Sequence, residues 1–387
     1  MLRKYKYIAG ILLVLMASRS GRAQAQTQAN IANNAAACPQ RAARPEEAFN
    51  AIERRNHSDI VGMCVGAVGP NYSETKCYGE ILNGSGIAPT DHTLFWIGSV
   101  TKTMTATLLA LRAREGTVDL NDRVDKYLPS NFHIPQITLL QLADMESGLQ
   151  RNPPNPFKSP QDDSELYTDL QLCVRHPLCW AGVNQYSYSN FGYGVLGSVL
   201  ANHDGPLPWS LDTFYYVMAP LGMFDSRVAQ DFTSLEFSAR RSYGHRRAGD
   251  AWTVLQTSSV SDAEAPAGGL WSTASDMLIW LKKSAQLHPT TNQVQLALKA
   301  TMECRGPWGK NSTCSSVEDC GRCTGLAWTE DIDPCTGGIR ISKSGSVPGF
   351  QAWIGFDKST GRGVFVLLNS EAIKGDTVGE ELLDLIP

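Results

Sequence analysis

Strand-like segments stand at both ends of this chain of 387 residues, with a long helical or irregular stretch between them. Segments with strand composition cover residues 60–68, 76–82, 93–97, 338–342, 350–356 and 363–368. Strands from both ends of a chain, separated by a helical insert, favour an α+β fold. We therefore predict an antiparallel sheet flanked by terminal helices, built from residues 38–115 and 256–387, and an all-helical domain over residues 116–255.

The first residues have the pattern of an export signal. Cations precede an apolar run over residues 8–17, and Ala23-Gln24-Ala25 forms a small-x-small cleavage site. The apolar run has about half of the roughly 20 residues that a membrane-spanning helix needs. We predict a signal peptide over residues 1–25, a flexible lead-in over 26–37, and a periplasmic or secreted mature protein without a transmembrane helix. An uncleaved anchor is the alternative.

The cysteine content favours disulfides in an oxidising compartment, because the chain has ten cysteines, an even number. Cys64 and Cys77 are symmetric about a turn, so in a hairpin they face each other across two strands. Cys173 and Cys179 form a second local pair. One segment holds a further group: Cys304, Cys314, Cys320, Cys323 and Cys335. The Cys-x-x-Cys spacing in this group leaves a zinc site as the alternative to disulfides.

Charge and motif content exclude several classes of partner. The formal net charge is -4 and like charges form no long run, so the chain has no basic field that would attract nucleic acid. The chain contains neither a His-Glu-x-x-His motif nor a Gly-rich phosphate loop. We therefore expect no cofactor.

Ser99 and Lys102 lie three residues apart where a strand meets a helix predicted over residues 101–115. At this spacing both side chains project from one face. A serine nucleophile needs an adjacent base, and a desolvated lysine can lose its proton near neutral pH. The alternative is that Ser99 only caps the helix and Lys102 is solvated. Ser73 and Lys76 have the same spacing, but in a turn and strand they do not share a face.

Two further short motifs carry groups that suit acyl-transfer chemistry. In an extended loop, Tyr188 and Asn190 would point the same way and offer a phenol and an amide. Lys343, Ser344 and Gly345 follow a predicted strand and offer a cation, a hydroxyl and room for close backbone approach. The alternatives are an aromatic loop packed on the core and a strand end that enters a turn.

In this order, Ser-x-x-Lys, Tyr-x-Asn and Lys-Ser-Gly resemble the three signatures of the serine β-lactamase and penicillin-binding protein superfamily. The resemblance covers nearly all of the mature chain. Tyr-x-Asn in second position is similar to class C β-lactamases. Together with the stretches at 268–273 and 325–328, the set looks most like D-alanyl-D-alanine carboxypeptidase/endopeptidases of the AmpH type. Ser344 replaces the commoner Thr, and the Cys-rich insert over 304–335 is not part of the family pattern.

The resemblance implies a β-lactamase/transpeptidase-like fold and a serine hydrolase that forms an acyl-enzyme. Ser99 would attack a carbonyl, Lys102 would accept its proton, and Tyr188 would transfer protons to the leaving amine and from water. The implied substrate-binding residues are Asn190, Lys343, Ser344, Gly345 and Ser346. The backbone N–H groups of Ser99 and Ser346 would form the oxyanion hole.

The activity that the resemblance implies is hydrolysis of D-alanyl-D-alanine peptides of peptidoglycan, with β-lactams as substrates or inhibitors. Three alternatives use the same groups. A class C β-lactamase differs mainly in how fast the acyl-enzyme hydrolyses. A related esterase needs no cation for a substrate carboxylate. A penicillin-binding sensor would acylate and stop, and would need a route across the membrane.

Overall fold

The computed structural model describes residues 38–154, 162–184, 186–205, 207–256, 260–286, 288–307 and 322–387. The predicted signal peptide, the lead-in over 26–37, Cys314 and Cys320 lie outside these residues.

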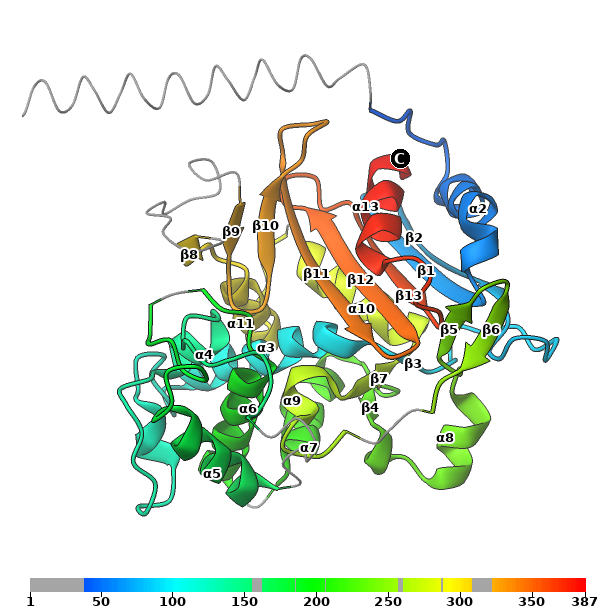
Figure 1. Cartoon of the computed structure of the whole chain (residues 1–387). Coiled ribbons are helices and arrows are strands. Elements are labelled where there is room, and N and C mark those ends of the chain that lie inside the picture. Colours follow the sequence, from blue (N-terminus) through cyan, green and yellow to red (C-terminus); the bar gives the residue numbers. More distant parts are fainter. Residues whose placement is uncertain are drawn as a thin grey trace, which may run out of the picture.

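A single antiparallel sheet of eight strands is the largest element of the described structure (Figure 1). Its strand order is β2-β1-β13-β12-β11-β10-β9-β8. The strands are β1 (Gly62–Gly69), β2 (Tyr72–Gly79), β8 (Gly306–Pro307), β9 (Arg322–Thr324), β10 (Thr329–Ile332), β11 (Ile339–Val347), β12 (Phe350–Asp357) and β13 (Gly363–Leu368). β1 pairs with β13, with Met63 opposite Leu368, so the sheet is assembled from both ends of the chain. The predicted α+β class with an antiparallel sheet is confirmed.

Two terminal helices, α2 (Pro45–Asn56) and α13 (Gly375–Leu385), cover one face of this sheet (Figure 1). Side chains alternate across a strand, so Met63 and Val65 point to this face and Cys64 points to the other. The second face carries the larger core, which includes the buried faces of most of the remaining helices.

The remaining α-helices lie between β2 and β8 in the sequence. They are α3 (Thr101–Glu115), α4 (Leu139–Ala143), α5 (Asp163–Cys173), α6 (Asn190–Asp204), α7 (Trp209–Thr213), α8 (Ser234–Arg240), α9 (Ala265–Gly268), α10 (Ala274–Ala285) and α11 (Gln293–Thr301). Helix α3 has the predicted bounds and ends at Gly116, which is left-handed with φ 75°. Its apolar residues were expected on one face, but every residue from Thr101 to Arg112 is buried. The reason is that α6, α9 and α11 all pack around α3.

Short strands also occur inside the segment predicted as all-helical. They are β4 (Arg227–Val228), β5 (His245–Ala248) and β6 (Ala251–Val254); β4 joins β3 (Phe95–Trp96) and β7 (Leu270–Ser272) in a small sheet. The β5–β6 hairpin is held against the main sheet because the His245 amide donates hydrogen bonds to the Gly349 and Asn369 carbonyls. The two-residue Gly249-Asp250 turn between β5 and β6 is itself a hairpin signal, which the prediction of an all-helical domain overlooked. The domain boundaries at 115 and 256 remain a prediction.

Disulfides link the described cysteines as Cys38–Cys335, Cys64–Cys77, Cys173–Cys179 and Cys304–Cys323. The two local pairs predicted from the sequence are confirmed. Cys64 and Cys77 are direct partners across β1 and β2. Because Cys323 is bonded to Cys304, it is not a free thiolate for the alternative zinc site.

No helix in the described ranges is long and apolar enough to cross a membrane. No group of three or more His, Cys, Asp or Glu residues in the same ranges could hold a metal ion.

Candidate active site

Ser99 lies where β3 runs into α3, on a single 3-10 turn over Gly98–Val100. Gly98 has φ 52°, a left-handed conformation that favours glycine. A Cβ on Gly98 would lie 3.0 Å from the Ser346 amide nitrogen, so the turn also depends on glycine for its close approach to β11. The N-cap of α3 is Val100 and no side chain caps this helix, so the capping role considered for Ser99 is wrong.

The Ser99 hydroxyl is held between an amine and a phenol. Lys102 Nζ donates to Ser99 Oγ at 3.2 Å, and the Tyr188 hydroxyl donates to the same oxygen at 2.7 Å. Lys102 is completely buried, so the alternative of a solvated lysine is wrong. This arrangement places two groups that can exchange protons next to one hydroxyl.

Among the described residues, the hydrogen-bond partners of the Lys102 amine are all neutral. Besides Ser99, Nζ donates to Asn190 Oδ1 at 2.8 Å and to the Ala267 carbonyl oxygen. Burial, and then the positive charge of Arg151, lowers the pKa of Lys102 well below its ordinary value. The amine is therefore suited to take the serine proton.

Asn190 is the first residue of α6, so the extended loop predicted through it ends one residue earlier. Ser189 caps the helix because its Oγ accepts from the Gly192 amide at 2.8 Å. Asn190 Nδ2 donates to Asn152 Oδ1 at 3.0 Å while its Oδ1 accepts from Lys102. The two bonds fix the orientation of the amide.

Lys343 was predicted to follow a strand that ends at residue 342. It lies instead in the middle of β11. The strand continues to Val347 because each of its later residues pairs with β12. Lys343 is 8% exposed, and its Nζ donates to the Ser344 carbonyl at 2.8 Å and lies 5.5 Å from the centre of the Tyr188 ring. Burial lowers the pKa of Lys343, and the nearby charges of Lys102 and Arg151 act in the same direction.

Strand β11 approaches the Ser99 turn so closely that only glycine fits at position 345. A Cβ on Gly345 would overlap the Ile97 carbonyl oxygen and lie 3.1 Å from the Ser99 amide nitrogen. The backbone of Ile97 and Ser99 is therefore in contact with the backbone at Gly345. The two proposed oxyanion-hole donors, the amides of Ser99 and Ser346, lie on these adjoining segments.

Replacing Gly345 with alanine is expected to slow acylation by a penicillin about 100-fold, the usual effect of misplacing one oxyanion-hole donor. The added methyl group must push β11 away from the Ser99 turn. The rate is measured with a fluorescent penicillin. Gly249→Ala is the control, because Gly249 is left-handed at φ 63° but has open space around it. An unchanged rate in Gly345→Ala would show that this contact does not matter.

A cleft of about 330 Å³ opens above these residues. Its lining includes five of the residues singled out from the sequence: Ser99, Tyr188, Lys343, Ser344 and Ser346. Lys102 and Asn190 join them through the hydrogen bonds described above, and Gly345 through its contact with the Ser99 turn. The structure therefore brings together all of the predicted site residues.

Three residues of this site were not predicted from the sequence. The Arg151 guanidinium carbon lies 4.9 Å from the centre of the Tyr188 ring, Asn152 binds Asn190, and the Ala267 carbonyl binds Lys102. Arg151 and Asn152 lie two and three positions after the stretch 139–149 that resembles the family, which was a usable signal. A backbone carbonyl such as that of Ala267 leaves no signal in the sequence.

Ser73 and Lys76, which share the Ser-x-x-Lys spacing, lie on β2 as expected. Lys76 Nζ forms an ion pair with Glu46 at 2.6 Å and also donates to Asn50. Its amine is committed to these partners. Lys76 is therefore not available as a base for Ser73.

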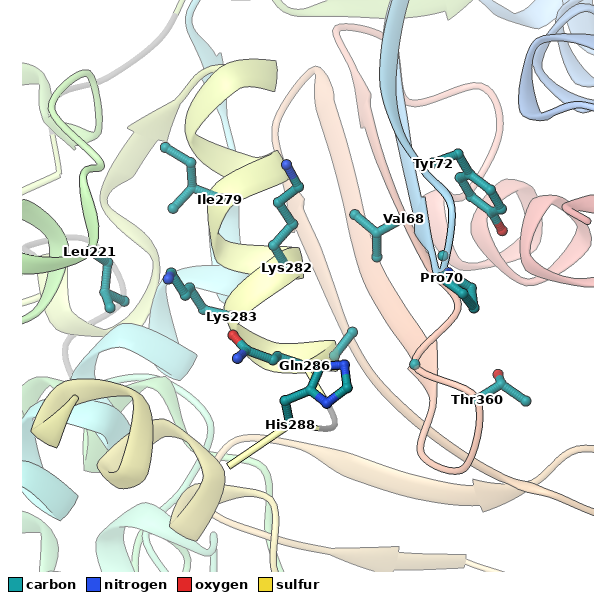
Figure 2. A pocket seen from close by; sticks show the side chains of 13 residues that line it. Val68, Pro70, Tyr72, Leu221, Ile279, Lys282, Lys283, Gln286, His288 and Thr360 are labelled. Atoms are coloured by element: carbon teal, nitrogen blue, oxygen red, sulfur yellow. The ribbon is translucent and has the colours of Figure 1, made fainter. Parts of the chain in front are cut away.

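A hollow of about 530 Å³ lies between the end of α10 and the β1–β2 and β12–β13 turns, away from Ser99 (Figure 2). Val68, Leu221 and Ile279 contribute apolar surface, and Lys282 and Lys283 lie along its α10 side. None of the predicted site residues lines it. The smaller cleft at Ser99 is therefore the candidate active site.

An α+β fold with a serine hydroxyl between a buried lysine and a tyrosine defines a class of serine acyl-transfer enzymes. The beta-lactamase family matches residues 52–385, which is most of the chain. The protein therefore belongs to the beta-lactamase family of serine hydrolases.

Similar proteins include both peptidases and β-lactamases. The chain is 28% identical over 267 residues to the D-alanyl-D-alanine-carboxypeptidase/endopeptidase AmpH of Escherichia coli K12; the match covers 64% of this chain and 66% of that protein, just under two thirds of its length. It is 25% identical over 333 residues to a beta-lactamase of Pseudomonas fluorescens, covering 80% of this chain and 89% of the relative.

Solved structures share the fold. A class C beta-lactamase from Rhodobacter sphaeroides superposes with a TM-score of 0.72 at 23% identity, covering 88% of this chain and 98% of that one. A beta-lactamase/D-alanine carboxypeptidase from Pseudomonas syringae gives 0.71 at 18% identity, covering 88% and 97%. The predicted β-lactamase/transpeptidase-like fold is confirmed.

Proposed function

We propose that this protein hydrolyses D-alanyl-D-alanine peptides of peptidoglycan as a carboxypeptidase/endopeptidase, through an acyl-enzyme on Ser99. The observation that carries the proposal is the Ser99 hydroxyl, hydrogen-bonded to Lys102 and Tyr188 at the floor of an open cleft. The likeness to a protein named for this activity supports the substrate class.

In the proposed reaction, Ser99 Oγ attacks the carbonyl carbon of the scissile amide and its proton passes to the neutral Lys102 amine. The amides of Ser99 and Ser346 hold the oxyanion. Tyr188 delivers a proton to the leaving amine as the C–N bond breaks. Water then attacks the ester, its proton returns through Tyr188 and Lys102 to Ser99 Oγ, and the product acid leaves.

The remaining residues of the cleft would bind the substrate. Asn190 would orient a substrate amide, because its side chain is fixed by Lys102 and Asn152. Lys343 and Ser344 would bind the carboxylate, and Gly345 leaves the backbone of β11 accessible. A carboxylate site argues against the esterase alternative, since an ester substrate needs none.

A class C β-lactamase is the second candidate. It is favoured by the beta-lactamase of Pseudomonas fluorescens, which the match covers over 89% of its length. The same residues acylate both kinds of substrate, and the rate of deacylation separates the two activities.

We also propose that the protein acts after export, in the periplasm or outside the cell. The disulfides support this, because such bonds persist in oxidising compartments. The sequence pattern of residues 1–25 supports it independently.

The deciding experiment compares D-alanine release from a muropeptide pentapeptide with hydrolysis of a chromogenic cephalosporin. We expect steady D-alanine release and slow cephalosporin turnover. Fast cephalosporin turnover without D-alanine release would establish the β-lactamase instead. Stoichiometric labelling without turnover of either substrate would establish the sensor.

A further inference from the structure

Arg151 is a cation in the lining of the cleft, and beyond lowering the pKa of Lys102 by its charge it has no role assigned above. Its guanidinium carbon lies 4.9 Å from the centre of the Tyr188 ring, and its side chain lines the cleft together with Ser99 and Lys343. Its guanidinium makes no hydrogen bond or ion pair with any residue in the described ranges. As far as the described residues are concerned, its N–H donors are therefore available to a ligand.

The charges of the cleft are unevenly distributed. The charged residues in its lining are Arg151, Arg322, Lys343, Asp331, Asp376 and Glu380. Arg322 is neutralised by an ion pair with Asp331. Asp376 and Glu380 enter from α13, which covers the opposite face of the sheet from α3, and neither has an ion pair with a described residue. An anionic group is thus repelled from the α13 side and attracted to Arg151 and Lys343.

The two available cations differ in how well they can hold an anion. Lys343 is 8% exposed, its Nζ already donates to the Ser344 carbonyl, and burial lowers its pKa, so its charge is costly to maintain. Arg151 is exposed. A guanidinium keeps its charge and binds a carboxylate through two parallel N–H bonds. Arg151 is therefore the stronger ligand for a carboxylate.

We infer that Arg151 binds the free C-terminal carboxylate of the substrate, beside Lys343, and so restricts the enzyme to acyl donors that end in a carboxylate. This inference rests on the proposed function, since it concerns the same cleft. It adds a specificity residue outside the three motifs. The carboxylate would lie on the Tyr188 side of β11, with the acidic residues of α13 on the other side.

The test uses a matched pair of substrates, diacetyl-Lys-D-Ala-D-Ala and its C-terminal carboxamide. We expect the wild-type protein to favour the carboxylate in kcat/KM. Arg151→Gln should reduce this preference about 10- to 100-fold, the range for losing a hydrogen bond to a charged group. Because the preference compares two substrates on the same variant, the effect of Arg151 on the pKa of Lys102 cancels from it. Arg151→Lys should restore part of the preference, since it returns the charge without the planar fork.

Lys282→Gln serves as the matched control. It removes the same unit of charge from the hollow beside α10, away from Ser99, and should leave the preference at the wild-type value. A preference in Arg151→Gln equal to that of the wild type would overturn the inference.

A binding measurement separates this inference from the proposed activity. If the wild-type protein hydrolyses neither peptide, calorimetry on Ser99→Ala and on Ser99→Ala with Arg151→Gln still compares affinity for the two peptides. Weaker binding of the carboxylate peptide in the double variant would support Arg151 as its ligand even though the peptidase proposal had failed. Equal binding in both variants would overturn the inference by itself.

Discussion

Replacing Ser99 with alanine is expected to abolish covalent labelling of the protein by a fluorescent penicillin. The Ser99 hydroxyl is the group held between Lys102 and Tyr188, and without it no oxygen is positioned to form the acyl bond. Removing a serine nucleophile reduces turnover by a factor on the order of 10⁶. Gel fluorescence measures the labelling, and mass spectrometry of the wild-type digest should place the adduct on the peptide that contains Ser99.

Ser73→Ala is the matched control for this experiment. Ser73 has a lysine at the same spacing, but Lys76 is paired with Glu46 on the surface of the sheet. The variant should label at the wild-type rate. Loss of labelling in Ser73→Ala together with persistence in Ser99→Ala would refute the site described above.

Replacing Lys102 is expected to have the second largest effect, a loss of about 10²- to 10⁴-fold in the acylation rate, as for other general bases. Lys102→Met removes the amine and keeps an apolar chain of similar length. Lys102→Arg keeps a positive charge but cannot release a proton. Both variants should show this loss in the acylation rate, because the proposed role needs a neutral amine. Thermal melting of each variant checks that it is folded.

The pH profile tests the same role with the wild-type protein. Burial and Arg151 lower the pKa of Lys102, so its neutral fraction rises as the pH rises through that lowered value. The acylation rate should therefore rise with pH over this limb and then level off. Among the described residues, the charged or titratable groups near the Lys102 amine are Tyr188, Tyr193, Lys343 and Arg151. A Lys102→Arg variant with the wild-type rate and profile would exclude lysine as the base.

The sequence predicted the elements of the fold better than their ends. Helix α3 and the strands β1, β2, β11, β12 and β13 were predicted because their signals are local: a strand composition, a helical period and a glycine stop. Strand β11 was predicted to end at residue 342, whereas pairing with β12 carries it to Val347 and places Lys343 inside the sheet. The β5–β6 hairpin was missed although its Gly249-Asp250 turn is a local signal; only its docking on Gly349 and Asn369 depends on distant segments.

The site divides in a similar way between what is local and what is not. The sequence alone determined that Ser99 and Lys102 share one face, because three positions on a helix bring two side chains together whatever surrounds them. It also determined which chemical groups the chain carries at Tyr188 and Lys343. The sequence itself does not show that the Tyr188 phenol contacts Ser99, 89 positions away.

Only the tertiary structure decided that these groups meet, and only it set their protonation and charge pairing. The approach of β11 to the Ser99 turn, the burial that lowers the pKa of Lys102, and the position of the Arg151 guanidinium over the Tyr188 ring all arise from contacts between distant segments. Desolvation and charge pairing depend on every neighbour in space. A motif in the sequence specifies the atoms but not their surroundings.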